Sequence, residues 1–138
     1  MDRWPELKYE QWNETLDTVH LWTQIAGKLR LKSEPLINHW WNVTLYVTPR
    51  GLTTSPMPLR DGGSYAVDFD FVGHELRIDA AERGRASFAL EPMSVAAFYD
   101  RLMRELRVLG VDVAINKKPN EVAQAIPFDT DIAHASYD

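Results

Sequence analysis

The residues that could do chemistry gather around residues 38–58, a β-prone stretch rich in aromatic, hydroxyl and amide side chains. Four of them lie within that stretch. The other two, His20 and Gln24, precede it and are four residues apart, which places their side chains on one face of a helix. Polar groups walled by aromatic rings are the usual make-up of a small-ligand site. The candidate ligand-binding residues are therefore His20, Gln24, His39, Trp40, Tyr46 and Arg50.

The same residues also have a purely structural interpretation, which carries the greater weight. Buried polar groups usually need hydrogen-bond partners and no substrate, so His20 and Gln24 can be satisfied beside the core. The sequence identifies neither a ligand nor a reaction, and it leaves open whether the protein is an enzyme. The alternative function is a non-catalytic interaction or self-association module, in which exposed Trp40 and Tyr46 anchor an interface.

A metal site could draw on three histidines and one of two aspartates, since imidazole and carboxylate ligands suit zinc or iron. The spacing matches no known metal motif, and no two histidines are four residues apart. We therefore predict neither a metal nor any other cofactor. The residues considered are His20, His39, His134, Asp129 and Asp131.

Four carboxylates with an arginine among them alternate along a predicted hairpin. Paired carboxylates can serve acid–base chemistry. A solvated face of a sheet has the same pattern, and we favour that interpretation. These residues are Asp68, Asp70, Glu75, Asp79 and Arg77.

Two amphipathic helices must position these groups. Apolar residues recur at three- and four-residue steps from about Tyr9 to Leu31, and His20 lies close enough to this stripe to point inward. The second helix follows Ser94 as its N-cap and ends before Gly110.

Strands are predicted between the helices. Alternation over residues 39–48 assigns Val47 to a core face beneath the first helix. A two-residue turn at Gly73-His74 would set Phe69 opposite Ile78. Alternation over residues 111–115 predicts a final strand after the second helix.

This order predicts an α+β fold: two layers, with a mainly antiparallel sheet of about five to six strands and both amphipathic helices on one face. Residues 1–116 are expected to form a single domain. Residues 117–138 show no sustained period, which indicates an extended C-terminal arm or linker towards a second half.

Composition excludes several function classes. Of the 138 residues 45% are hydrophobic, which argues against disorder, and the net charge of −5 disfavours nucleic acid as a partner. No run approaches the roughly 20 apolar residues that span a bilayer. Because the N-terminus lacks a signal pattern and cysteine is absent, we expect a cytoplasmic location without disulfide or thiolate chemistry.

Several strings of this sequence are similar to a bacterial family of uncharacterised proteins, domain-of-unknown-function family 5996. They are WPELKYEQW, HLWTQIAGKLRL, NHWW followed by LYVTPRGLTTSP, SVAAFYDRLM and IPFDTDIAHASYD, and the resemblance runs over nearly all of the chain. Family members continue beyond the HASYD string, so the resemblance implies that this chain is the N-terminal half, either as a piece of a longer protein or as a natural half-length member. A second half would then be a partner domain, whereas a second copy of the chain is the partner that the interaction-module alternative predicts. The resemblance implies no activity.

Overall fold

The computed structural model describes residues 4–34 and 43–138. They form two α-helices, one short 3-10 helix and a six-stranded antiparallel sheet, which is the predicted α+β class. In chain order the elements are α1 (Tyr9–Ser33), β1 (Tyr46–Thr48), β2 (Gly51–Thr53), β3 (Met57–Pro58), β4 (Ser64–Asp70), β5 (Glu75–Ala80), β6 (Gly84–Ala89), α2 (Val95–Val108) and η2 (Phe128–Thr130). In the described part, neither α-helix has a stretch long and apolar enough to cross a bilayer.

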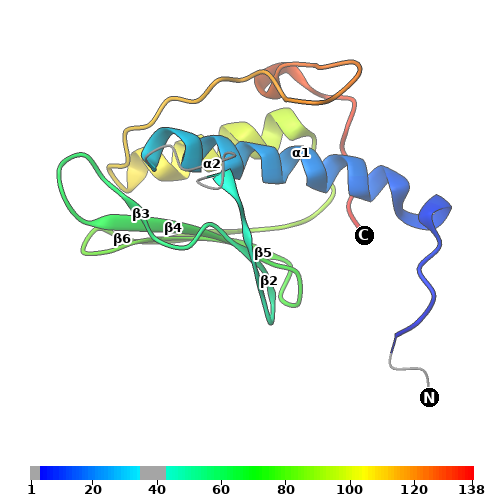
Figure 1. Ribbon diagram of the computed structural model, residues 1–138, viewed down its shortest axis with the longest axis horizontal. Helices are drawn as coiled ribbons and strands as arrows, with labels where there is room; N and C mark the ends of the chain where they lie inside the picture. The colour runs from blue at the N-terminus through cyan, green and yellow to red at the C-terminus, as the bar shows by residue number, and fades with distance from the viewer. Residues whose placement is uncertain (1–3, 35–42) are drawn as a thin grey trace.

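The strand order is β1-β2-β4-β5-β6, and β3 also pairs with β4. Figure 1 shows both helices on the same side of this sheet. The chain that follows α2 runs back over the helices on the side away from the sheet (Figure 1). A description in two layers therefore accounts for the helices and the sheet but not for this last segment.

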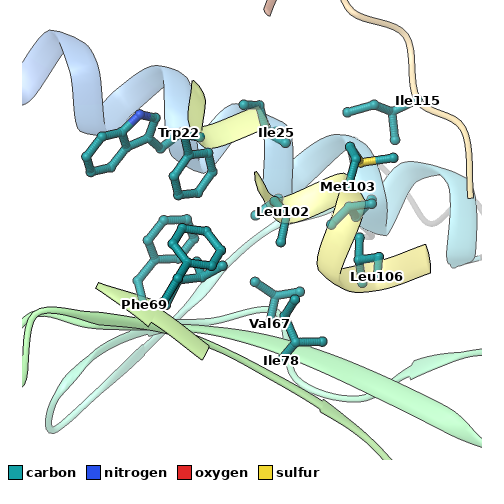
Figure 2. Close-up of a cluster of buried hydrophobic side chains, with 14 of the residues drawn as sticks. Trp22, Ile25, Val67, Phe69, Ile78, Leu102, Met103, Leu106 and Ile115 are labelled. Atoms are coloured by element: carbon teal, nitrogen blue, oxygen red, sulfur yellow. The ribbon is translucent and has the colours of Figure 1, made fainter. Parts of the chain in front are cut away.

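The core lies between the helices and the sheet (Figure 2). The Trp22 ring of α1 stacks on Phe98 of α2 at a centroid distance of 4.9 Å, and Phe98 stacks on Phe69 of β4 at 6.0 Å. All three side chains are buried. Each large apolar side chain that is buried in this way contributes about 1.5–3 kcal/mol, so the aromatic stack joins α1, α2 and the sheet.

The helix predictions are confirmed in position. The Ser94 hydroxyl accepts a hydrogen bond from the Ala97 backbone N–H at 3.0 Å, as expected of an N-cap. Gly110 follows α2 with a φ of +73°, in the left-handed region that favours glycine.

The predicted register of the β4–β5 hairpin was wrong by two residues. Phe69 pairs with Leu76, and the turn takes the four residues 71–74. The cause is the Asp70 side chain: its Oδ1 accepts hydrogen bonds from the N–H groups of Val72 at 2.9 Å and Gly73 at 2.7 Å, which closes a wider turn. Because the shift is an even number of residues, every side chain keeps its predicted face.

The prediction that Val47 belongs to the core was also wrong. Val47 pairs with Leu52, which pairs with buried Phe69, so the three share one face of the sheet. Burial falls towards the edge, however: Leu52 is partly buried, and Val47 is 85% exposed. The core therefore covers the middle of the sheet and not its β1 edge.

Residues 111–115 do not form the predicted last strand. The Val111 N–H bonds to the Leu106 carbonyl at 2.9 Å, which turns the chain along the helices and not back into the sheet. Val111 and Ile115 are still buried, and Ile115 lies beside Met103 of α2 (Figure 2). The alternating pattern identified the buried residues but not what covers them.

Candidate functional site

His20 and Gln24 share a helical face as predicted, but that face is turned away from the core. His20 is exposed, so the expectation that it points inward was wrong. The Gln24 amide donates to the Asn120 carbonyl at 2.9 Å and accepts from the Asn120 N–H at 2.9 Å. Its Nε2 lies 3.4 Å from the His20 Nε2. Gln24 thus holds the C-terminal segment against α1.

Tyr46 and Arg50 have separate partners at the two ends of the β1–β2 hairpin. The Arg30 guanidinium lies over the Tyr46 ring, 5.3 Å from its centroid. The Arg50 Nε donates to Asp70 Oδ2 at 2.7 Å. The predicted residues His39 and Trp40 lie outside the described residues. Of the four candidates that the structure describes, only His20 and Gln24 form a side-chain hydrogen-bond contact with each other.

The metal ligands that we considered do not come together in the part of the chain that the structure describes, where no three histidine, aspartate or glutamate side chains converge. Asp129 pairs with Lys117 at 2.9 Å, and Asp131 pairs with His134 at 2.7 Å. His39 lies outside the described residues.

Asp70 is not part of a solvated face, because its side chain is only 2% exposed. Besides the turn N–H groups, it accepts hydrogen bonds from Arg50 Nε at 2.7 Å and from Arg77 Nη2 at 2.5 Å. The Arg50 hydrogen bond, followed by that of the Gly73 N–H, lowers the pKa of Asp70 to about 2. This carboxylate, ionised at neutral pH, ties the β1–β2 turn, β4 and β5 together, which is a structural role.

A hollow of about 430 Å³ lies between the end of α1, β3 and the segment after α2. We call it the Tyr65 hollow after Tyr65, a lining residue whose aromatic side chain is buried. Apolar side chains form much of its wall, and two cations and one carboxylate also line it. The lining residues are Lys32, Ser33, Pro58, Leu59, Arg60, Tyr65, Val111, Asp112, Val113 and Ala114.

Two hydroxyls of the Tyr65 hollow lie within hydrogen-bond distance of each other. Ser33 Oγ lies 2.7 Å from the Tyr65 hydroxyl oxygen. Burial is the main cause that raises the pKa of Tyr65, and the charge of Glu34 acts in the same direction, so the phenol stays protonated at neutral pH. A protonated phenol can both donate and accept, so it can bind a ligand hydroxyl, carbonyl or carboxylate oxygen.

The sequence reasoning missed the role of Asp131 and His134. Asp131 Oδ1 accepts from the N–H groups of Ala133 and His134, and Oδ2 accepts from His134 Nδ1 at 2.7 Å. The carbonyls of Asp131 and His134 accept from the first N–H groups of α2, those of Ala96 and Val95. This turn therefore caps α2. The Asp-x-x-His spacing was the only signal that could have revealed it.

Tyr137 connects the same segment to the sheet. Its hydroxyl lies 2.7 Å from His74 Nδ1 in the β4–β5 turn, and its ring packs 5.5 Å from that of Trp22. Burial, followed by the charge of Asp70, raises the pKa of Tyr137. These contacts give Tyr137 and His74 structural partners.

Comparison with known proteins extends this picture. A family model described as a family of unknown function, DUF5996, matches residues 4–138. The match covers essentially the whole chain, so the expectation of an N-terminal half was slightly off. No curated protein and no solved structure matches the chain significantly.

Proposed function

Since the chain belongs to a family of unknown function, DUF5996, its role has to be argued from its own side chains, and we propose that it binds a small molecule in the Tyr65 hollow. The observation that carries this proposal is the part-buried Tyr65–Ser33 hydroxyl pair within a partly apolar hollow. Ligand pockets are typically about 300–1,000 Å³ and combine apolar walls with a few polar groups that orient the ligand. The Tyr65 hollow has this composition.

The hollow limits the kind of ligand. An apolar body can contact Leu59, Val111 and Val113, while one oxygen pairs with the hydroxyls of Tyr65 and Ser33. This proposal moves the site to a different set of residues beside α1. The pocket expected from the sequence stays a prediction, because two of its six members lie outside the described residues.

The test uses Tyr65→Phe, which removes the hydroxyl and keeps the ring. Small alcohols, amides and acids with an apolar body are screened by thermal shift and isothermal titration. We expect a ligand of the wild type to bind about tenfold more weakly to Tyr65→Phe, since one hydrogen bond is lost. Tyr99→Phe is the matched control, because Tyr99 lies on α2 and does not line the hollow.

A second variant, Val113→Trp, fills the hollow while leaving the hydroxyl pair in place. It should abolish binding of the same ligands without changing the fold, as checked by circular dichroism. Ligands that bind both variants as tightly as the wild type, or a screen without any ligand, would contradict the proposal.

A second candidate function is protein interaction, and the segment before and at the start of α1 favours it. Trp4, Leu7 and Tyr9 are 90%, 64% and 57% exposed. Figure 1 shows this segment running away from the helices and the sheet. Large exposed aromatic side chains are enriched at binding sites.

This second candidate predicts association that depends on those side chains. Analytical ultracentrifugation should show a concentration-dependent assembly that Trp4→Ala combined with Leu7→Ala removes, with an unchanged Tm. Identical sedimentation of the two proteins would count against an interface at this segment.

The location in a bacterial cytoplasm also remains a proposal. A chain without cysteine forms no disulfide and so needs no oxidising compartment, and cell fractionation of the native host would test the location.

A further inference from the structure

β6 forms one edge of the sheet, and within the described residues no strand pairs with its outer side. The Leu90 N–H bonds to the His74 carbonyl at 2.8 Å, which continues the β5–β6 register. In an antiparallel pair, successive residues direct their N–H and C=O groups alternately to the two sides. Arg85, Ser87 and Ala89 therefore direct theirs away from β5, and all three are exposed.

We propose that this edge pairs with β6 of a second copy of the chain, antiparallel, with Phe88 opposite Phe88. In this register Ser87 lies opposite Ala89, and both residues have outward N–H and C=O groups, so a ladder of hydrogen bonds can form. A two-fold axis through the centre makes the contact isologous and closed, which is the commonest symmetry of soluble oligomers.

Charge complementarity selects this register and this occupant. Arg85 and Glu91 lie three residues on either side of Phe88, so the axis brings Arg85 of each copy opposite Glu91 of the other. The Arg85 side chain is 83% exposed and contacts Asp79 at 3.2 Å. Glu91 is exposed and has no ion pair within the described residues. A strand with opposite charges equidistant from its centre is complementary to itself.

Neighbouring registers fit less well. An odd shift would place buried-face residues opposite outer-face residues. Centring the pair on Ser87 would set Glu91 opposite Arg83, whose guanidinium already bonds to Asp61 and to the Gly110 carbonyl. Centring it on Ala89 would leave Arg85 without a carboxylate opposite it.

The surface beside the edge also suits a second copy. A hollow of about 500 Å³ lies between β6 and α2. Phe88, Met93 and Ala97 supply its apolar lining, and the Arg101 guanidinium lies 5.4 Å from the centroid of the Phe88 ring. A second sheet edge on β6 would shield this apolar surface from water.

The absence of cysteine allows a direct test by cross-linking. In the proposed register, Ser87→Cys combined with Ala89→Cys brings each new thiol opposite its counterpart, at the Cα separation of about 5.5 Å that a disulfide accepts. Mild oxidation of the full chain should yield a covalent dimer on a non-reducing gel. Each single variant should stay monomeric on that gel.

Cross-linking of Ser87→Cys alone would overturn the register, because it would place Ser87 opposite itself. Failure of the double variant to cross-link to itself would overturn self-pairing. Self-pairing would also be overturned if the double variant formed a disulfide with an added extended peptide that bears a cysteine but not with itself. The β6 edge would then pair with a strand from another protein.

Charge reversal provides an independent measurement by sedimentation equilibrium. Arg85→Glu and Glu91→Arg should each weaken the dimer by about tenfold in Kd, because two cross-strand pairs become repulsive. The two changes together should restore it. Tm values of all variants control for folding. A wild type that is monomeric at every concentration, or single reversals without effect, would refute the proposal.

Discussion

Asp70 shows how much one buried side chain decides in this protein. Its carboxylate sets the length of the β4–β5 turn and neutralises the guanidinium groups of Arg50 and Arg77. Alternation assigned it correctly to the outer face of the sheet. Alternation could not show that Arg50 and Arg77 would both bind Asp70 and bury it, because Arg50 belongs to the β1–β2 hairpin and approaches Asp70 only in the folded sheet.

The lowered pKa of Asp70 makes stability depend on pH. Its folded pKa of about 2 lies below the ordinary value near 3.9, so the ionised form stabilises the fold above about pH 4 and this contribution is lost as the pH falls towards 2. Asp70→Asn should therefore lower Tm at pH 7, and the difference from the wild type should shrink between about pH 4 and 2. Thermal unfolding followed by circular dichroism measures this.

Asp79→Asn is the control at this scale, because Asp79 is exposed and, among residues 4–34 and 43–138, forms an ion pair with Arg85 alone. We expect it to change Tm little. A constant difference between wild type and Asp70→Asn down to pH 2 would contradict the assigned pKa.

At the scale of the elements, local patterns predicted both helices, the α2 cap and the buried faces of β4 and β5. They failed where a longer-range contact decides. Residues 111–115 have strand periodicity, but their buried side chains pack over helices. The Tyr65 hollow could not be predicted at all, because Ser33, Leu59 and Tyr65 meet only after α1, β3 and β4 are in place.

Gly51 marks a close approach between two elements. A Cβ added there would lie 2.0 Å from the Phe69 carbonyl oxygen, in a backbone position that cannot move without breaking the β2–β4 pairing. Gly51→Ala should thus cost about 2 kcal/mol or more of the free energy of unfolding. Urea denaturation measures the loss.

Gly27→Ala is the matched comparison. Its Cβ would meet the Val43 carbonyl at an ordinary 3.5 Å inside α1. Alanine is the better helix former, so this variant should be neutral or gain up to about 1 kcal/mol. If Gly51→Ala and Gly27→Ala changed the free energy of unfolding equally, the close approach at Gly51 would not determine the cost of a side chain there.

At the scale of the whole molecule, the segment after α2 connects the two helices and the sheet. It contacts α1 through Asn120 and Ser136, caps α2 through residues 131–134, and reaches the β4–β5 turn through Tyr137. The sequence predicted its lack of regular structure but not its contacts, because single polar and aromatic side chains make them without any period.

Substitution of Phe128 tests how much the packing of the segment after α2 contributes to the stability of the protein. Its side chain is fully buried although it lies on a three-residue 3-10 helix. Phe128→Ala should cost about 3–5 kcal/mol of the free energy of unfolding in urea. Ile132→Ala, whose side chain is exposed, should change it by less than about 0.5 kcal/mol. A small effect of both would mean that the segment detaches readily.

The hydrogen bond from the Ser136 N–H to the Thr18 hydroxyl joins residues separated by 118 positions. Contacts between such distant parts of a chain delay folding, because a large loop must close before they form. During synthesis α1 leaves the ribosome long before Ser136 and Tyr137, so the parts of Thr18 and Trp22 that these two residues cover stay exposed until the end of the segment has emerged. Chaperone binding to nascent chains of this protein should therefore peak late in translation.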